Sequence, residues 1–235
     1  MRERKPVGPP TEIAATLPSV GQIVEAVNSR TRTIDQRLYR AAYASEWVLP
    51  NQVRTPYRFG PPRSAIAADG TMPFQWWYVA LDATTAVWEA QFCQNDGSRV
   101  GTFYMDHAAV NNGVLAGLNF PRPLRLWDLN GEASSVLGVY DLLSSPDYEW
   151  CQWFGGRLHE ATMMMDEVQR PDGVLYPSRR HRGHAAIIVP FGVLDELRTS
   201  ITVCVERFAE TDTFRRLYDD PLRVDPPLSS DFGID

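Results

Sequence analysis

The chain has 235 residues, of which 44% are hydrophobic and 22% charged, a balance typical of a globular protein with a sizeable core. The net charge of −6 argues against the broad cationic surface that nucleic acids require, so we expect no direct nucleic-acid binding. The longest apolar run, residues 185–194, is about half as long as a membrane-spanning helix. We therefore expect no membrane span. The three widely spaced cysteines predict no disulfide framework, so we expect a reducing, cytoplasmic location.

The N-terminal part of the chain has helical and proline-rich patterns. Residues 1–12 are charged and proline-rich and are predicted to form a lead-in segment. Apolar residues at helical spacing predict helices over residues 19–27 and 34–47. We interpret residues 1–51 as an N-terminal helical arm that caps the core. A contact between copies is the alternative, which leaves a homo-oligomer open.

After residue 52 the patterns change to strands, helices and turns. A short strand is predicted over residues 54–59, and an aromatic-rich strand over 75–81. Asp82 is expected to accept hydrogen bonds from the first free amides of a helix over residues 83–94. Residues 124–129 belong to a less regular stretch.

The second half predicts one long helix and several strands. Residues 148–168 have helical tendency, and Gly155-Gly156 should kink or divide that helix. Strands are predicted over three further segments: residues 173–176, 185–189 and 199–205. Because the order lacks regular βαβ alternation, the fold class is α+β. We place the core domain at residues 52–195, with a C-terminal strand and an acidic, proline-containing tail over 196–235.

Common catalytic and metal motifs are absent from the sequence. There is no GxGxxG after a strand, no P-loop, no HExxH and no GxSxG. The three cysteines are far apart and form no CxxC pair. His181 and His184 lie in an arginine-rich turn with no carboxylate or cysteine adjacent in sequence, so no metal is expected.

Four residues are candidates for a site, although each also has a structural interpretation. Glu89 is the only ionisable group of its predicted helix and is either exposed or placed within a site. Tyr78 is either a core aromatic or a ligand contact, and Arg58 either a surface ion-pair partner or a phosphate clamp. Ser178 follows a short strand, where a hydroxyl commonly caps a turn.

Taken together and in order, these residues resemble the RES domain family, named for its Arg, Glu and Ser. The resemblance covers roughly residues 52–195 and rests on four short stretches: residues 56–62 (PYRFGPP), 77–90 (WYVALDATTAVWEA), 126–129 (LWDL) and 172–179 (DGVLYPSR). It implies a fold like that of ADP-ribosyltransferases, with NAD as substrate and a separately encoded Xre-type antitoxin as partner. By position it also implies a catalytic set of Arg58, Tyr78, Glu89 and Ser178.

The chemistry of NAD cleavage suits these residue types. Nicotinamide is already cationic at its glycosidic nitrogen, so one carboxylate suffices where ordinary glycosidases need two. Glu89 would stabilise the oxocarbenium-like transition state, and Ser178 would orient Glu89 or the ribose. The residues expected to contact NAD are Arg58, Tyr57, Tyr78 and Arg179.

The expected activity is cleavage of the nicotinamide–ribose bond of NAD by hydrolysis or phosphorolysis. Two alternatives remain open at this point. The first is a mono-ADP-ribosyltransferase, which would break the same bond but pass ADP-ribose to a macromolecule. The second is a non-catalytic interaction module that has kept the fold.

Overall fold

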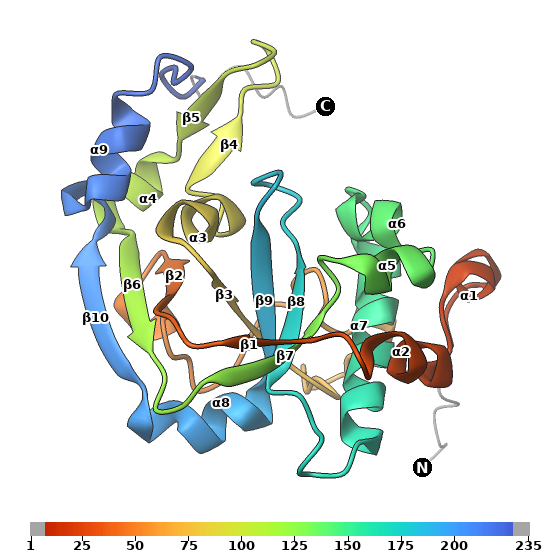
Figure 1. Cartoon of the computed structure of the whole chain (residues 1–235). Helices are drawn as coiled ribbons and strands as arrows, with labels where there is room; N and C mark the ends of the chain where they lie inside the picture. The colour runs from red at the N-terminus through yellow and green to blue at the C-terminus, as the bar shows by residue number, and fades with distance from the viewer. Residues whose placement is uncertain (1–7, 228–235) are drawn as a thin grey trace.

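The computed structural model describes residues 8–227 and confirms the α+β class (Figure 1). Eight strands form one curled sheet in the order β1-β7-β8-β9-β3-β2-β6-β10, and β4 and β5 form a separate two-stranded sheet. All neighbours in the large sheet are antiparallel except β7 and β8. The strands are β1 (Thr31–Ile34), β2 (Leu38–Ala42), β3 (Trp76–Ala80), β4 (Cys93–Asn95), β5 (Phe103–Met105), β6 (Val114–Asn119), β7 (Leu124–Asp128), β8 (Gly173–Pro177), β9 (Ala185–Pro190) and β10 (Thr202–Arg207).

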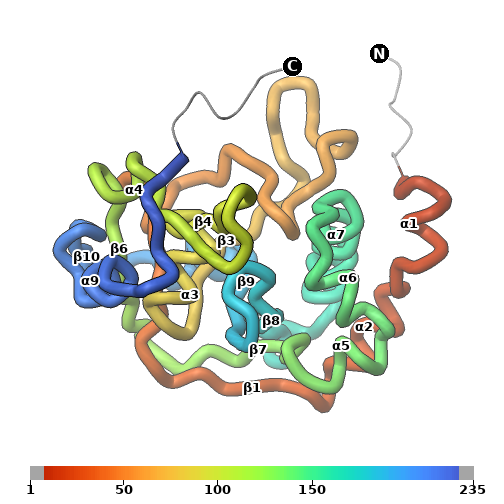
Figure 2. Tube along the Cα trace, turned by 90° about the horizontal axis from the view of Figure 1, so that it is seen from above, coloured from red at the N-terminus to blue at the C-terminus, as the bar shows by residue number. Residues whose placement is uncertain are grey.

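Helices flank both faces of the large sheet. In Figure 2, α1, α2, α5, α6 and α7 lie together on one side of the molecule, away from α3 and α9. The helices are α1 (Thr11–Thr16), α2 (Val20–Val27), α3 (Ala83–Glu89), α4 (His107–Asn112), α5 (Glu132–Val136), α6 (Tyr140–Ser144), α7 (Tyr148–Met164), α8 (Phe191–Leu197) and α9 (Asp212–Tyr218).

Alternation along the central strands divides the core between the two faces of the sheet. In β3, Trp76 and Tyr78 contact the cluster that includes α2 and α7, whereas Trp77 and Val79 contact the opposite cluster with α8. This is the period of two that a pleated strand imposes. A third cluster packs α3 and the β4–β5 hairpin beside the sheet.

The N-terminal segment is only partly helical. The helix predicted over residues 19–27 is confirmed as α2, but the helix predicted over 34–47 is wrong, because this segment forms part of β1, all of β2 and a short 3-10 turn. β2 lies inside the sheet between β3 and β6, with Leu38, Ala41 and Ala42 buried. A strand buried on both faces does not alternate, and these apolar positions also fit helical spacing. The domain division at residue 52 stays a prediction.

Two elements around the candidate residues also differ from prediction. Residues 54–59 are not a strand: they end in a turn in which the Gly60 amide donates to the Tyr57 carbonyl at 3.1 Å. The helix predicted over 83–94 begins correctly but ends at Glu89, because Gln91 has a φ of 62° and the chain reverses into β4. Asp82 accepts from the Thr85 amide, which confirms it as the cap.

The strands of the second half follow the sequence more closely. β8 and β9 are confirmed, and each extends one residue beyond the predicted end. β10 begins three residues late, and most of it is exposed because it lies at the sheet edge. The less regular stretch at 124–129 contains β7. Among residues 8–227, no helix is both long and apolar enough to cross a membrane.

The predicted kink at Gly155-Gly156 is wrong, because α7 runs unbroken through both glycines. Gly155 instead permits a close backbone approach: a Cβ atom there would overlap the carbonyl group of Phe59. A Cβ atom on Gly156 would meet only the Phe74 ring, at an ordinary 3.5 Å. The first glycine therefore fixes the turn that contains Arg58 against α7.

We expect Gly155→Ala to destabilise the fold by about 1–3 kcal/mol, because overlap with backbone cannot be relieved by a side-chain movement. Gly156→Ala is the matched control and should be neutral or stabilising by up to about 1 kcal/mol, since alanine favours helix. Urea unfolding of both variants measures the difference. Equal effects of the two substitutions would contradict the close approach.

His159 on α7 supplies a pH dependence of stability. Its ring stacks on Phe74 at a centroid distance of 5.1 Å, and burial lowers its pKa from the ordinary value. As the pH falls below about 6.5, His159 is protonated in the unfolded chain at a higher pH than in the folded chain. The free energy of unfolding therefore decreases as the pH is lowered.

The substitution His159→Phe keeps an aromatic ring there and removes the titration. The loss of stability between neutral and mildly acidic pH should therefore be smaller in His159→Phe than in the parent. His107→Phe, at an exposed position, is the control. Denaturant midpoints at several pH values test this, and parallel pH curves for parent and His159→Phe would contradict it.

Candidate active site

The hydroxyl-bearing residues of the site lie on one face of the sheet. Tyr78 in β3 is opposite Ile188 in β9, which in turn is opposite Val174 in β8. Val174 and Tyr176 share a face of β8, and Ser178 follows at the next position of the same parity. The pleat thus directs the side chains of Tyr78, Tyr176 and Ser178 to the same side.

Glu89 is brought to this group by α3, of which it is the last residue. The Ser178 hydroxyl donates to Glu89 Oε1 at 2.5 Å, and the Tyr176 hydroxyl donates to Oε2 at 3.1 Å. The carboxylate is part-buried. Glu89 therefore does not lie on an exposed helix face, and its catalytic role stays a prediction.

The direction of the Ser178 hydroxyl is set by its neighbours. Its Oγ accepts from the His181 amide at 2.9 Å, so its own proton is directed to Glu89. The Ser178 amide donates to the His184 carbonyl at 2.9 Å. Ser178 is also buried. These contacts with the turn that follows β8 hold it in this position.

Tyr78 links the sheet to the turn before it in sequence. Its hydroxyl oxygen accepts from the Phe59 amide at 2.9 Å, and its ring meets that of Tyr57 edge to face at 5.7 Å. Burial raises the pKa of Tyr78, and the Glu89 carboxylate raises it further, against the opposing effects of the Phe59 amide and Arg58. Tyr78 is therefore a neutral phenol.

Arg58 is buried in the turn over residues 57–60, with 6% of its surface exposed. One terminal nitrogen donates to the Leu143 carbonyl. Its Nε and other terminal nitrogen have no hydrogen-bond partner among residues 8–227. A buried guanidinium with free donors is costly unless an acceptor arrives, and carboxylate or phosphate oxygens are its best-matched acceptors.

Tyr148 at the start of α7 lies between two cations. The guanidinium carbon of Arg58 is 5.7 Å from the ring centroid, and that of Arg179 is 5.6 Å away. These cation–π contacts bring Arg179 to the same region as Arg58. Among the six residues predicted as site residues or NAD contacts, Tyr57 thus contacts Tyr78, Ser178 contacts Glu89, and Arg58 and Arg179 share Tyr148 as a neighbour.

Two residues of this group were missed by sequence reasoning. Tyr176 donates to Glu89 and is fully buried, and burial followed by the nearby Glu89 carboxylate raises its pKa, so it remains a donor. The alternation of β8 could have found it, because it lies two residues before Ser178 on the same face. Tyr148 carries no comparable signal, since its place depends on how α7 packs.

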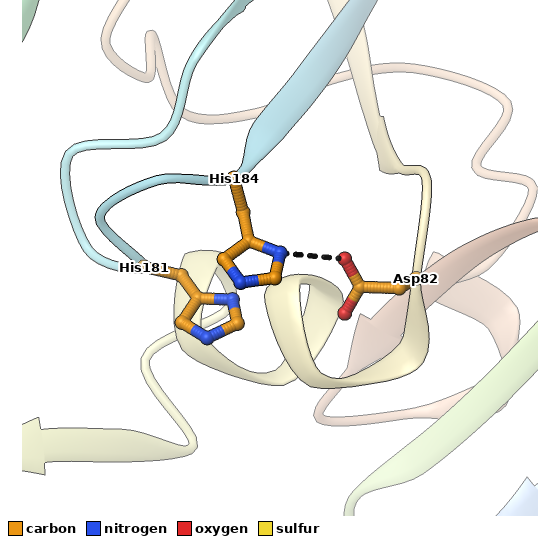
Figure 3. Close-up of side chains that lie close together, drawn as sticks. All are labelled: Asp82, His181 and His184. Atoms are coloured by element: carbon orange, nitrogen blue, oxygen red, sulfur yellow. Dashed lines mark ion pairs between the residues drawn. The ribbon is translucent and has the colours of Figure 1, made fainter.

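A separate polar cluster lies beside the site. It shows that the two histidines have a carboxylate neighbour, which the sequence did not indicate. His181 and His184 have no carboxylate near them in sequence, but Asp82 lies beside them in space, as Figure 3 shows. His184 Nδ1 is 3.4 Å from Asp82 Oδ2. Asp82 and the two histidines are close because the turn between β8 and β9 packs against the start of α3.

Comparison with known proteins agrees with the family suggested by the sequence. No curated protein is similar to this chain in sequence at a significant level. Among solved structures, the MbcT–MbcA toxin–antitoxin complex of M. tuberculosis is similar to it with a TM-score of 0.49 and 17% identity, over 79% of this chain and 91% of that chain. The RES domain family matches residues 37–208, most of the sequence. The chain belongs to the RES domain family.

Proposed function

We propose that the chain cleaves the nicotinamide–ribose N-glycosidic bond of NAD by hydrolysis or phosphorolysis. The observation that carries the proposal is the Glu89 carboxylate, held by the Ser178 and Tyr176 hydroxyls within a group of residues that also contains Arg58. Family membership supports the same chemistry, and the stretches that resemble the family would make Arg58, Glu89 and Ser178 the Arg, Glu and Ser of its name.

The proposed step needs one carboxylate and no acid. The bond between the anomeric carbon and the nicotinamide nitrogen breaks, and its electron pair neutralises the pyridinium, so the leaving group needs no proton. Positive charge develops on the ribose, and the fixed Glu89 carboxylate stabilises it electrostatically. A water or phosphate oxygen then bonds to the anomeric carbon, and a water loses its proton to solvent.

The remaining residues would bind and orient the substrate. The unpartnered donors of Arg58, with Arg179 beyond the Tyr148 ring, suit the diphosphate of NAD. Tyr78 and the half-exposed Tyr57 offer ring surfaces for the nicotinamide. Ser178 acts through Glu89 as a positioning residue.

We further propose that a separately encoded antitoxin of the Xre type binds this chain, which is the partner that the resemblance to the RES domain family implies.

Glu89→Gln tests the carboxylate directly. The amide keeps the shape of the side chain but removes its charge, so NAD turnover should fall about a hundredfold or more. Glu160→Gln, at an exposed position of α7, is the matched control and should keep full activity. NAD depletion by the purified full chain gives the rates. Near-parental turnover in Glu89→Gln, with the fold verified by circular dichroism, would refute the proposal.

Arg58→Lys tests the phosphate clamp. Lysine keeps the positive charge but lacks the planar fork of donors, so we expect KM for NAD to rise about tenfold or more, with a smaller change in kcat. Arg157→Lys, on an exposed pair with Glu160, is the control. An unchanged KM in Arg58→Lys would remove Arg58 from the binding site.

The products distinguish the forms of the reaction. With inorganic phosphate, phosphorolysis yields phosphorylated ADP-ribose, whereas hydrolysis yields free ADP-ribose with or without it. With NAD labelled in its ADP-ribose part, label that stays on a macromolecule would instead indicate ADP-ribosyl transfer. No turnover and no thermal shift with NAD would favour a non-catalytic module.

A further inference from the structure

Three potential metal ligands converge beside the proposed active site, from two segments of the chain. Asp82 precedes α3, and His181 and His184 lie in the turn between β8 and β9. One ligand atom from each residue lies within 4.8 Å of the other two. Figure 3 shows the His184 ring directed at the Asp82 carboxylate, with the His181 ring beside it.

Without a metal, the cluster is held together by stacking of the two imidazole rings and by the Thr85 hydroxyl. The two imidazole rings are parallel within 8° and 3.8 Å apart. Two cationic rings would repel each other in this arrangement, and the neutral imidazole is the form that metals bind. The Thr85 hydroxyl lies 2.6 Å from Asp82 Oδ2 and 2.8 Å from His181 Nδ1, and it therefore bridges the two segments.

We propose that Asp82, His181 and His184 together bind one divalent transition-metal cation of the Zn²⁺ class. Two imidazole nitrogens and one carboxylate oxygen are a ligand set that Zn²⁺ accepts, with a solvent molecule in the fourth position. The His184 side chain is 48% exposed, which leaves the cluster open to solvent and gives a cation access. The site is separate from Glu89, and the proposal does not depend on NAD cleavage.

Metal binding requires a local rearrangement that the turn can make. Parallel stacked rings direct their nitrogen lone pairs in parallel planes, so one ring must rotate before both can bind one ion. His184 is exposed and follows Gly183, which has a φ of 83° and an open environment. The cation would take the lone pair of one nitrogen on each ring, and the Thr85 hydroxyl would remain as a hydrogen-bond donor to the Asp82 carboxylate.

A bound cation would cross-link α3 to the turn that follows β8. Without it, this turn meets the start of α3 through the 3.4 Å contact of His184 Nδ1 with Asp82 Oδ2 and through the threonine bridge. Because the unfolded chain lacks the assembled site, binding should stabilise the fold. At a free cation concentration about 100 times Kd, the midpoint of thermal unfolding should rise by about 5–10 °C.

The test is titration of the metal-free full chain with Zn²⁺ by calorimetry in a non-chelating buffer, with Co²⁺ absorption reporting the ligand set. We expect one equivalent to bind, with thermal stabilisation. His184→Ala, an exposed and structurally mild change, should weaken binding by at least about a hundredfold, and Asp82→Asn, which keeps the helix cap, by at least about tenfold. His107→Ala, at an exposed histidine elsewhere, should bind as the parent does.

One further variant separates this site from adventitious binding. Cys204 is an exposed thiol that could bind Zn²⁺ by itself, and Cys204→Ser should leave the titration unchanged. Loss of binding in Cys204→Ser, equal affinity in the parent and in His184→Ala, or the absence of saturable one-site binding would each overturn the proposal. NAD turnover of the metal-free chain is measured separately, so failure of either proposal is recognised independently.

Discussion

The arrangement of the site depends on satisfying one part-buried carboxylate. Glu89 ends α3, and the C-terminal end of a helix disfavours a negative charge by about 0.3–1 kcal/mol. The hydroxyls of Ser178 and Tyr176 more than offset this, because a hydrogen bond to a charged group contributes about 1.5–3 kcal/mol. The carboxylate therefore keeps its position only where β8 and the residue that follows it present both hydroxyls to one side. This requirement connects the strand register to the chemistry of the site.

The cation of the site is positioned by backbone packing. Gly155 lets the chain at Phe59 lie directly against α7, and the Phe59 ring then meets Tyr176 edge to face at 4.8 Å. Arg58 is consequently carried into the interior, with two nitrogens unpartnered among the described residues. Such a group is unfavourable in the free protein. Its burial is explained most simply by an anionic ligand that completes its hydrogen bonds.

Local patterns predicted the elements that carry the site better than they predicted its surroundings. The aromatic-rich run of β3, the short apolar runs of β8 and β9 and the capping role of Asp82 are properties of short segments, and the structure agrees with them. The segment over residues 34–47 was mistaken for helix because a doubly buried strand loses its alternation. Arg58 was expected in a strand, although its turn is held by contacts with α7. Tyr148 and the Asp82–His184 pair depend on tertiary packing alone and leave no local signal.

The turn over residues 178–184 contacts both ends of α3. At the C-terminal end of the helix, Ser178 donates to Glu89, and at the N-terminal end His184 and His181 meet Asp82 and Thr85. A hydrogen bond within the turn links the two contacts, since the His181 amide donates to the Ser178 hydroxyl. A shift of the turn relative to α3 would therefore change the Asp82 cluster and the Glu89 carboxylate together. The position of Glu89 therefore depends on the helix and the turn as one unit, and not only on its two hydroxyl donors.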